Sequence, residues 1–400
     1  MFKKYMIMAA AKYIIIGEVN VVKILFVHNT AMPYRIPFFK KLTEQYDVDF
    51  IFTHFQRSFK RRGMKASIHE LEDSDYKILD NRLPMENALN LLFVLLKSDF
   101  DIVVGSIDYI PPSALITNSL CFFIGKLKGK KTIFWSEEWG WPMHPLRKII
   151  SPFLNYIIRN CDVLIVPGKR HEKHVISLGA PVKKVFILPN GTNLTRKSSD
   201  YLKMEKLRYK WQNQKIILYV GQLRKLKGIH YLIKAFAKLR YKVENVILLI
   251  IGKGEYEDKL NNLCKELNIA NKVYFLGFIK NEDLGPYYLL ADLFVMPSVT
   301  DKGFAEAWGL VVNESMTFET PVIATNAVGC AFEMIENDVN GYIIPEKDEN
   351  ALYKSMLKVL SDNYLMEKMG KNSRVKVEKE FTYEKMVNGF NQTIKFLRIP

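Results

Sequence analysis

Residues 306–314 read Glu-Ala-Trp-Gly-Leu-Val-Val-Asn-Glu, and a short apolar strand pattern, PVIAT, follows at residues 321–325. The apolar run after Gly309 predicts a helix that begins near this glycine, so that Glu306 lies on the preceding loop and Glu314 lies inside the helix. Eight helical steps span about 12 Å, which is too far for two carboxylates to share a proton. The spacing instead fits two contacts to one elongated ligand whose anionic middle lies at the helix N-terminus. A nucleotide sugar has this form.

The spacing alone has a simpler interpretation, which is a surface glutamate before an amphipathic helix that contains a second glutamate. The surrounding sequence favours the ligand. Residues 297–329, PSVTDKGFAEAWGLVVNESMTFETPVIATNAVG, resemble the donor-binding segment of the retaining glycosyltransferases of family 4, the glycosyl transferases group 1. Glu306 and Glu314 fall on the E-x7-E pair of that family.

The resemblance covers nearly all of the C-terminal half and is loose in the N-terminal half. It includes ILYVGQLRKLKG at 217–228, LLIIGKGEYE at 248–257, KVYFLGF at 272–278 and NGYIIP at 340–345. It implies the GT-B fold. The looser match in the N-terminal half fits a domain that binds varied acceptors.

The pattern of strands and helices agrees with two α/β domains. From Lys23 onward, short Val, Ile, Leu and Phe runs alternate with helical segments, which predicts parallel sheets covered on both faces. The 400 residues have room for two such domains. We expect two Rossmann-like, doubly wound domains that face each other across a cleft. The predicted parts are an N-terminal extension (1–22), an acceptor-side domain (23–193), an interdomain linker (194–214), a nucleotide-sugar domain (215–380) and a C-terminal helix that crosses back to the first domain (381–400).

Composition excludes several kinds of site. No apolar run approaches the roughly 20 residues of a membrane-spanning helix, and the signal-like start of the chain is interrupted by Lys12. The four cysteines (Cys121, Cys161, Cys264 and Cys330) are too scattered for a zinc site and are expected to be buried thiols in a reducing, cytoplasmic compartment. No metal or other cofactor is predicted besides the nucleotide sugar as co-substrate.

The donor side is predicted from the resemblance. Glu306 is expected to hold the donor sugar, Glu314 the ribose, and Lys227 with Arg224 the diphosphate as its negative charge develops. Further donor contacts are expected from Gly221, Gln222, Gly254, Gly277, Phe278, Trp308, Gly309 and Leu310.

Two positions depart from the family pattern. Gln222 stands where relatives usually have an arginine, so Arg224 is a candidate replacement for it. Glu319 stands where glycine is common; if the helix end there needs a left-handed residue, Glu319 costs roughly 1 kcal/mol.

The acceptor side is less distinct. HNTAMPYRIP follows the first predicted strand, and FWSEEWGW ends a later one where relatives often carry a histidine. Lining the cleft and ordinary packing explain these residues about equally well; for FWSEEWGW the alternative is that Trp139 and Trp141 cover the cleft floor. The candidates are Asn29, Tyr34, Arg35, Trp135, Ser136, Glu137 and Glu138.

We expect a retaining transferase that moves a hexosyl unit from a UDP- or GDP-sugar to a hydroxyl of a glycan or lipid-linked saccharide. A sugar-nucleotide epimerase and an inactive nucleotide-sugar-binding subunit are the alternatives.

The net charge of +16 lies mostly in the first half of the chain and needs its own explanation. An anionic membrane surface, nucleic acid and a general solubility charge are the candidates. Nucleic acid does not account for the paired glutamates. The basic segments HFQRSFKRRGMK (54–65) and GKLKGKK (125–131) predict docking on the inner face of the cell membrane.

Overall fold

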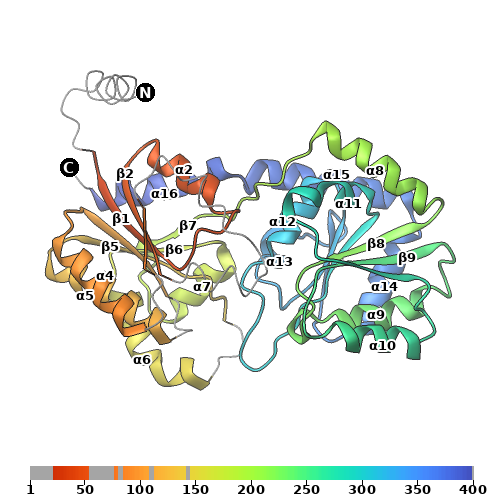
Figure 1. Ribbon diagram of the computed structural model, residues 1–400, viewed down its shortest axis with the longest axis horizontal. Coiled ribbons are helices and arrows are strands. Elements are labelled where there is room, and N and C mark those ends of the chain that lie inside the picture. The colour runs from red at the N-terminus through yellow and green to blue at the C-terminus, as the bar shows by residue number, and fades with distance from the viewer. Residues whose placement is uncertain (1–20, 54–75, 80–83, 108–111, 141–144, 399–400) are drawn as a thin grey trace.

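The computed structural model describes residues 21–53, 76–79, 84–107, 112–140 and 145–398 and contains two α/β domains, one after the other along the chain (Figure 1). Both sheets are parallel and doubly wound, which confirms the predicted fold class. Two strands are built from branched apolar residues alone. β6 (Val163–Val166) and β9 (Val246–Ile251) contain only Val, Ile and Leu, and every residue of both is buried. Burial on both faces explains why these strands show no polar alternation.

The first domain holds a seven-stranded sheet in the order β3-β2-β1-β4-β5-β6-β7. Its remaining strands are β1 (Lys23–His28), β2 (Asp47–Phe52), β3 (Tyr76–Ile78), β4 (Ile102–Ser106), β5 (Lys131–Trp135) and β7 (Val185–Ile187). One face is covered by α4 (Pro84–Lys97), α5 (Pro112–Leu127), α6 (Pro145–Asn160) and α7 (Lys169–Ser177). The other face is covered by α2 (Ile36–Thr43) and by α16 (Tyr383–Leu397).

The second domain holds a six-stranded sheet in the order β10-β9-β8-β11-β12-β13. Its other strands are β8 (Lys215–Val220), β10 (Val273–Gly277), β11 (Leu293–Met296), β12 (Val322–Thr325) and β13 (Gly341–Ile344). Its helices are α8 (Ser198–Lys210), α9 (Ile229–Leu239), α10 (Glu257–Glu266), α11 (Gly285–Leu290), α12 (Leu310–Thr317), α13 (Ala331–Met334), α14 (Glu349–Leu360) and α15 (Asn363–Glu380). The strand order reverses between β8 and β11, which is where ligands bind in doubly wound sheets.

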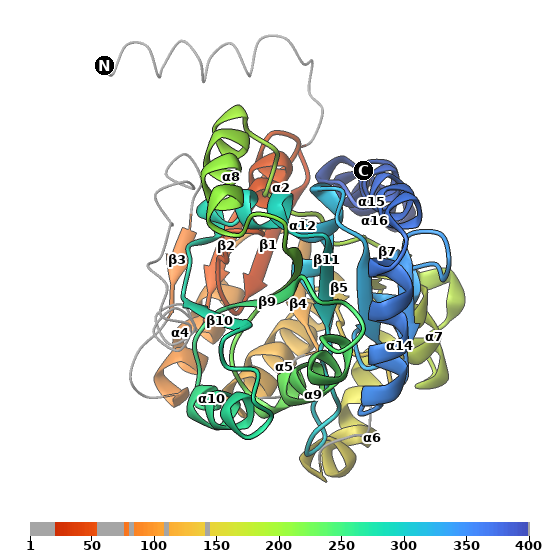
Figure 2. The ribbon, with the colours of Figure 1, turned by 90° about the vertical axis from the view of Figure 1, so that its right-hand side faces the viewer.

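Two segments join the domains. The segment predicted as a linker contains α8, which packs against α11 of the second domain. At the other end, α15 and α16 follow one another along the same side of the molecule (Figures 1 and 2). Phe390 and Ile394 of α16 belong to the core of the first domain, and the Tyr383 hydroxyl donates a hydrogen bond of 2.7 Å to the Tyr34 carbonyl. The last helix therefore fixes one domain to the other.

The end of α12 shows how the Glu319 departure is accommodated. Glu319 has a φ of 61°, in the left-handed region that glycine adopts most easily. Its carboxylate lies 3.2 Å from Arg196 and 3.0 Å from Arg374. The backbone conformation anticipated from the sequence is therefore present, and two cations hold the strained residue.

The four cysteines are free and buried, as predicted. Within the described part of the chain, no helix has the length and apolar character needed to cross a membrane.

Candidate active site

The N-terminus of α12 is shaped by a glycine that no other residue could replace easily. Gly309 caps the helix with a φ of 99°. A Cβ atom there would lie 2.9 Å from the Met296 sulfur and 3.0 Å from Val328. This close packing brings the first turn of α12 down onto the end of β11, at the reversal of strand order. Glu306 lies on the loop just before this turn, and Glu314 lies within the helix, as the sequence predicted.

Lys227 and Glu306 form an ion pair at this point, with Lys227 Nζ donating to Glu306 Oε2. Both side chains are less than one-fifth exposed. Lys227 ends a single 3-10 turn after β8, and the next residue, Gly228, has a φ of 64°. A Cβ on Gly228 would overlap the Pro297 carbonyl oxygen at 1.9 Å. Tight packing at this glycine therefore holds Lys227 against the loop that carries Glu306.

Arg224 lies apart from this pair. Its side chain is 44% exposed, and its Nε lies 3.8 Å from a Glu255 carboxylate oxygen. The Gln222 carbonyl accepts a hydrogen bond of 3.0 Å from the Tyr219 hydroxyl. The structure therefore brings Lys227, but not Arg224, together with Glu306.

Glu314 is buried, with only 6% of its surface exposed. Its carboxylate accepts hydrogen bonds from Asn281 Nδ2 at 2.9 Å and from the Tyr288 hydroxyl at 2.8 Å. Burial raises the pKa of Glu314 to about 7, and the two hydrogen bonds oppose this rise. The same burial and the nearby carboxylate raise the pKa of Tyr288 well above its usual value. Glu314 is thus a carboxyl group that titrates near neutrality.

The other predicted donor residues differ in exposure. Trp308 is buried, and its indole N–H donates to Asn313 Oδ1 at 2.9 Å, whereas Leu310 is half-buried. Phe278 is 49% exposed directly after Gly277, which has a φ of 71°. Gly221 and Gly254 lie on adjacent loops, where the Leu223 amide donates a hydrogen bond of 3.0 Å to the Lys253 carbonyl. A Cβ on Gly254 would lie 2.3 Å from the Leu223 carbonyl oxygen.

The acceptor-side residues gather around a buried arginine. Arg35 donates to Asn190 Oδ1 at 2.7 Å and to Glu137 Oε1 at 2.6 Å. Its guanidinium lies 4.6 Å from the centre of the Trp135 ring. Trp135 itself is buried in the core of the first domain, and its ring packs against the Arg35 guanidinium. The Arg35 guanidinium also lies 5.4 Å from the centre of the Tyr34 ring. Asn29 lines a small pocket at the ends of β1 and β4, and Ser136 is buried just after β5.

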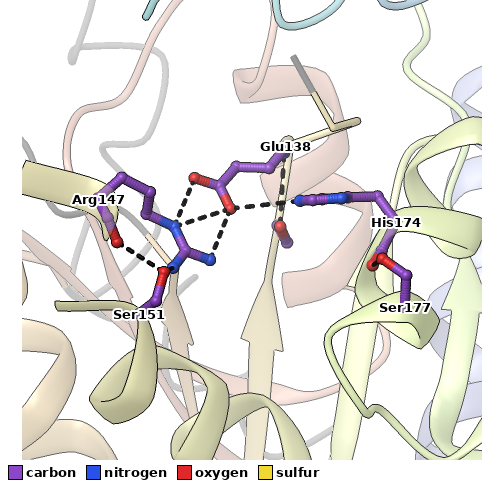
Figure 3. Close-up of polar contacts among 6 residues, drawn as sticks. Glu138, Arg147, Ser151, His174 and Ser177 are labelled. Carbon is purple, nitrogen blue, oxygen red and sulfur yellow. Dashed lines mark hydrogen bonds and ion pairs between the residues drawn. The ribbon is translucent and has the colours of Figure 1, made fainter. Parts of the chain in front are cut away.

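Glu138 belongs to a separate cluster with Arg147 and His174 (Figure 3). Its carboxylate accepts hydrogen bonds from Nε and Nη2 of Arg147 on α6, both at 3.1 Å. Nε2 of His174 on α7 lies 3.8 Å away. Although burial acts in the opposite direction, the hydrogen bonds and charges of His174 and Arg147 lower the pKa of Glu138. The cluster therefore anchors the FWSEEWGW loop to two helices.

Two residues of the first domain, Trp139 and His171, bond to the loop that carries Glu306, and Arg170 bonds to the loop after β12. Trp139 Nε1 donates to the Glu306 carbonyl at 2.9 Å. His171 Nε2 lies 3.1 Å from the Ala307 carbonyl, and because a carbonyl only accepts, this nitrogen carries the proton. Burial lowers the pKa of His171 to about 4, so the ring is neutral around pH 7. Arg170 donates to the Asn326 carbonyl at 2.9 Å, and its guanidinium lies 3.5 Å from the centre of the Trp139 ring.

The sequence did not predict these contacts between the two domains, and it did not single out Asn281, Tyr288 or Asn313. One signal was available: GKRHEKH follows β6 directly, at the carboxyl end of a parallel strand, where functional residues gather. No group of His, Cys, Asp and Glu residues in the described ranges has the arrangement of a metal site.

Comparison with known proteins agrees with this geometry. Residues 204–376 match the family model described as Glycosyl transferases group 1. An uncharacterized glycosyltransferase of Methanocaldococcus jannaschii is 32% identical over 56% of this chain and 57% of its own length. The capsular polysaccharide biosynthesis glycosyltransferase CapM of Staphylococcus aureus is 30% identical over 58% of this chain and 62% of its own length. The matched segments thus span about three-fifths of each relative.

A solved structure extends the likeness to the whole fold. The Anabaena protein HepE, in a crystal structure with UDP and glucose, superposes with a TM-score of 0.75. The superposition covers 94% of this chain and 99% of HepE, at 18% sequence identity. The chain therefore has the GT-B fold of glycosyltransferases, and its second domain carries the sequence pattern of the Glycosyl transferases group 1 family.

Proposed function

We propose that the protein is a retaining glycosyltransferase that moves a hexosyl unit from a UDP- or GDP-sugar to a hydroxyl of a glycan or lipid-linked saccharide. The observation that carries the proposal is the placement of Lys227, Glu306 and Glu314 around the N-terminus of α12. A cation and a carboxylate lie just before α12, a second carboxylate lies within it, and the helix begins where the strand order reverses. The family match at residues 204–376 and the UDP bound by HepE support a nucleotide-sugar donor.

In this proposal, the donor diphosphate lies at the first turn of α12, where backbone N–H groups and the helix dipole favour negative charge. The diphosphate competes with Glu306 for Lys227, because both are anions within reach of the same ammonium group. Once Lys227 turns to the diphosphate, Glu306 is released to accept hydrogen bonds from the donor sugar. Lys227 then stabilises the leaving diphosphate as its charge develops, and Glu306 steadies the positive charge that builds on the sugar.

The acceptor is proposed to lie against Glu137 and Arg35, on the opposite wall. Retention of configuration fits a site whose residues stabilise charge rather than attack the sugar. In such a reaction the bond from the anomeric carbon to the diphosphate breaks, the acceptor oxygen bonds to that carbon on the same face, and the acceptor proton passes to the departing diphosphate.

Two measurements test the proposal. A thermal-shift screen of nucleotide sugars identifies the donor, since a ligand at a hundred times its dissociation constant adds about 2.7 kcal/mol of stability. Incubation of that donor with glycan and lipid-linked acceptors, followed by NMR of the product, then reports whether the new bond keeps the donor's anomeric configuration. A donor-only product would point to an epimerase. Binding without turnover on any acceptor would point to an inactive nucleotide-sugar-binding subunit.

A further inference from the structure

Three neighbouring helices of the first domain each leave a row of large apolar side chains exposed to solvent. On α4 and α5 the spacing of these residues repeats every three, four or seven positions, which places each row on one side of its helix. Leu127 and Ile149 are each more than three-quarters exposed. The exposed residues are Leu89, Phe93 and Leu96 on α4, Ile116, Phe123 and Leu127 on α5, and Ile149 and Tyr156 on α6.

The three rows form one surface, because the helices are packed side by side. Phe122 and Phe123 of α5 contact Tyr156 and Phe153 of α6, with ring centroids 5.9 Å and 6.1 Å apart. Lys128, just after α5, donates hydrogen bonds of 3.1 Å and 3.2 Å to the carbonyls of the last turn of α4. Figures 1 and 2 both show α5 between α4 and α6 on the outer side of the domain. We call this surface the α4–α5–α6 face.

The charges that the three helices carry are mostly positive. The helices contain a single acidic residue, Glu86, against five cations. Arg147 is buried against Glu138 and Lys126 pairs with Asp162, but Lys97, Lys148 and Arg159 are exposed. An apolar surface edged by cations is complementary to a bilayer of anionic lipids, whose interior accepts Phe, Leu and Ile and whose headgroups attract Lys and Arg. A second copy of the same face would bring like charges together.

The basic segments singled out in the sequence do not provide such a surface within the described residues. The first, residues 54–65, lies outside them. In the second, Lys126 pairs with Asp162 at 2.8 Å, Lys130 lies 3.6 Å from Asp99, and Lys128 is held by the carbonyls at the end of α4. These lysines therefore contribute mainly to the packing of the helix ends, and the apolar rows are the more distinctive feature.

We propose that the α4–α5–α6 face docks on the surface of an anionic lipid bilayer, with its apolar rows in the headgroup boundary and its exposed cations near lipid phosphates. The inference does not depend on the proposed transferase activity. It does give α6 two roles. The outer side of α6 presents Ile149 and Tyr156 to the lipid, while Arg147 on its inner side holds Glu138 of the acceptor-side loop (Figure 3). A membrane-bound α6 would thus place the acceptor-side wall close to the bilayer.

The test is co-flotation of the full-length protein with phosphatidylcholine vesicles that contain or lack phosphatidylglycerol, at low salt. The first variant carries Phe93→Ser, Phe123→Ser and Leu127→Ser. Its matched control carries Tyr241→Ser, Tyr364→Ser and Val375→Ser, three similarly exposed apolar residues of the second domain. A third variant carries Lys97→Glu and Lys148→Glu. Because all of these residues are exposed, thermal unfolding should change little in each variant.

Wild type and the control are expected to float with the phosphatidylglycerol vesicles. The apolar variant should lose more than about tenfold in vesicle affinity, and the charge variant should lose a comparable amount only where phosphatidylglycerol is present. The inference is overturned if wild type ignores anionic vesicles. It is also overturned if the apolar variant binds as well as wild type, since binding then comes from another part of the chain. A wild-type dimer that the apolar variant converts to monomer, without vesicle binding, would assign the face to a second copy instead.

Discussion

Replacing Glu314 by Gln should make the protein more stable at alkaline pH and lower its affinity for a nucleotide. The amide can keep both contacts of the carboxyl, accepting from Asn281 Nδ2 and donating to the Tyr288 hydroxyl. It therefore imitates the protonated form of Glu314 and removes only the titration. Below the unfolded-state pKa of 4.5, at about pH 4, Glu314 is protonated in both the folded and the unfolded protein, so wild type and Glu314→Gln should be nearly equally stable there.

The magnitude follows from the pKa. In the folded protein the pKa of Glu314 is about 7, above its ordinary value of 4.5. Between these two values the folded state binds more protons than the unfolded state, so stability falls as pH rises. At about 1.4 kcal/mol per pH unit, the difference between 4.5 and about 7 amounts to about 3 kcal/mol by pH 8. Glu314→Gln, which has no charge to bury, should escape this loss.

The assay is the difference in unfolding midpoint between wild type and Glu314→Gln at several pH values from 4 to 8, so that the titration of every other group cancels. We expect almost no difference at pH 4, an advantage of the variant that grows between about pH 4.5 and pH 7, and little further change above pH 7. In parallel, nucleotide affinity at pH 8 should be lower in the variant, because ribose hydroxyls donate better to a carboxylate than to an amide. A stability difference that stays constant from pH 4 to pH 8 would refute the assignment of a raised pKa to Glu314.

Four further predictions concern the rest of the site. Glu306→Gln and Lys227→Ala should each lower turnover by roughly a hundredfold, measured under saturating donor; wild-type rates in both would place the site elsewhere. Glu137→Gln should impair transfer while donor affinity, measured by calorimetry, stays nearly unchanged. Trp139→Phe keeps an aromatic ring but loses the hydrogen bond to the Glu306 carbonyl, so single-turnover rates should fall by roughly fivefold, as for about 1 kcal/mol, with the unfolding temperature little altered. Glu319→Ala should destabilise the protein, because it keeps the left-handed strain and loses both ion pairs, whereas Glu319→Gly should be nearly neutral in denaturant unfolding.

The parts of the structure that sequence reasoning predicted are those determined by local pattern. Val163–Val166 and Val246–Ile251 could only be strands covered on both faces, and runs of this kind, alternating with helices, lead to doubly wound sheets. The apolar run after Gly309 likewise predicted the start of the helix and the positions of Glu306 and Glu314 relative to it. The left-handed conformation at Glu319 was raised instead by the resemblance to a family in which glycine is common at this position.

The contacts between the domains could not be predicted in this way. Trp139 and Glu306 are separated by 167 positions, and nothing near either residue indicates that one donates to the carbonyl of the other. His171 lies in a polar helix that reads as a surface segment, yet a loop of the second domain covers it completely. Trp135 illustrates a related difficulty. In a sheet buried on both faces, the strand pattern does not say which aromatic residue opens onto the cleft.

The position of α16 has a consequence for the order in which the protein takes shape during synthesis. The first domain leaves the ribosome before the second, but Phe390 and Ile394, which help to cover one face of its sheet, emerge only after the second domain. The core of the second domain draws on residues up to Phe381 and can close before them. The half of the protein that is made first is therefore finished last. A stop codon before Tyr383 would leave the second domain intact and remove core from the domain at the opposite end of the gene.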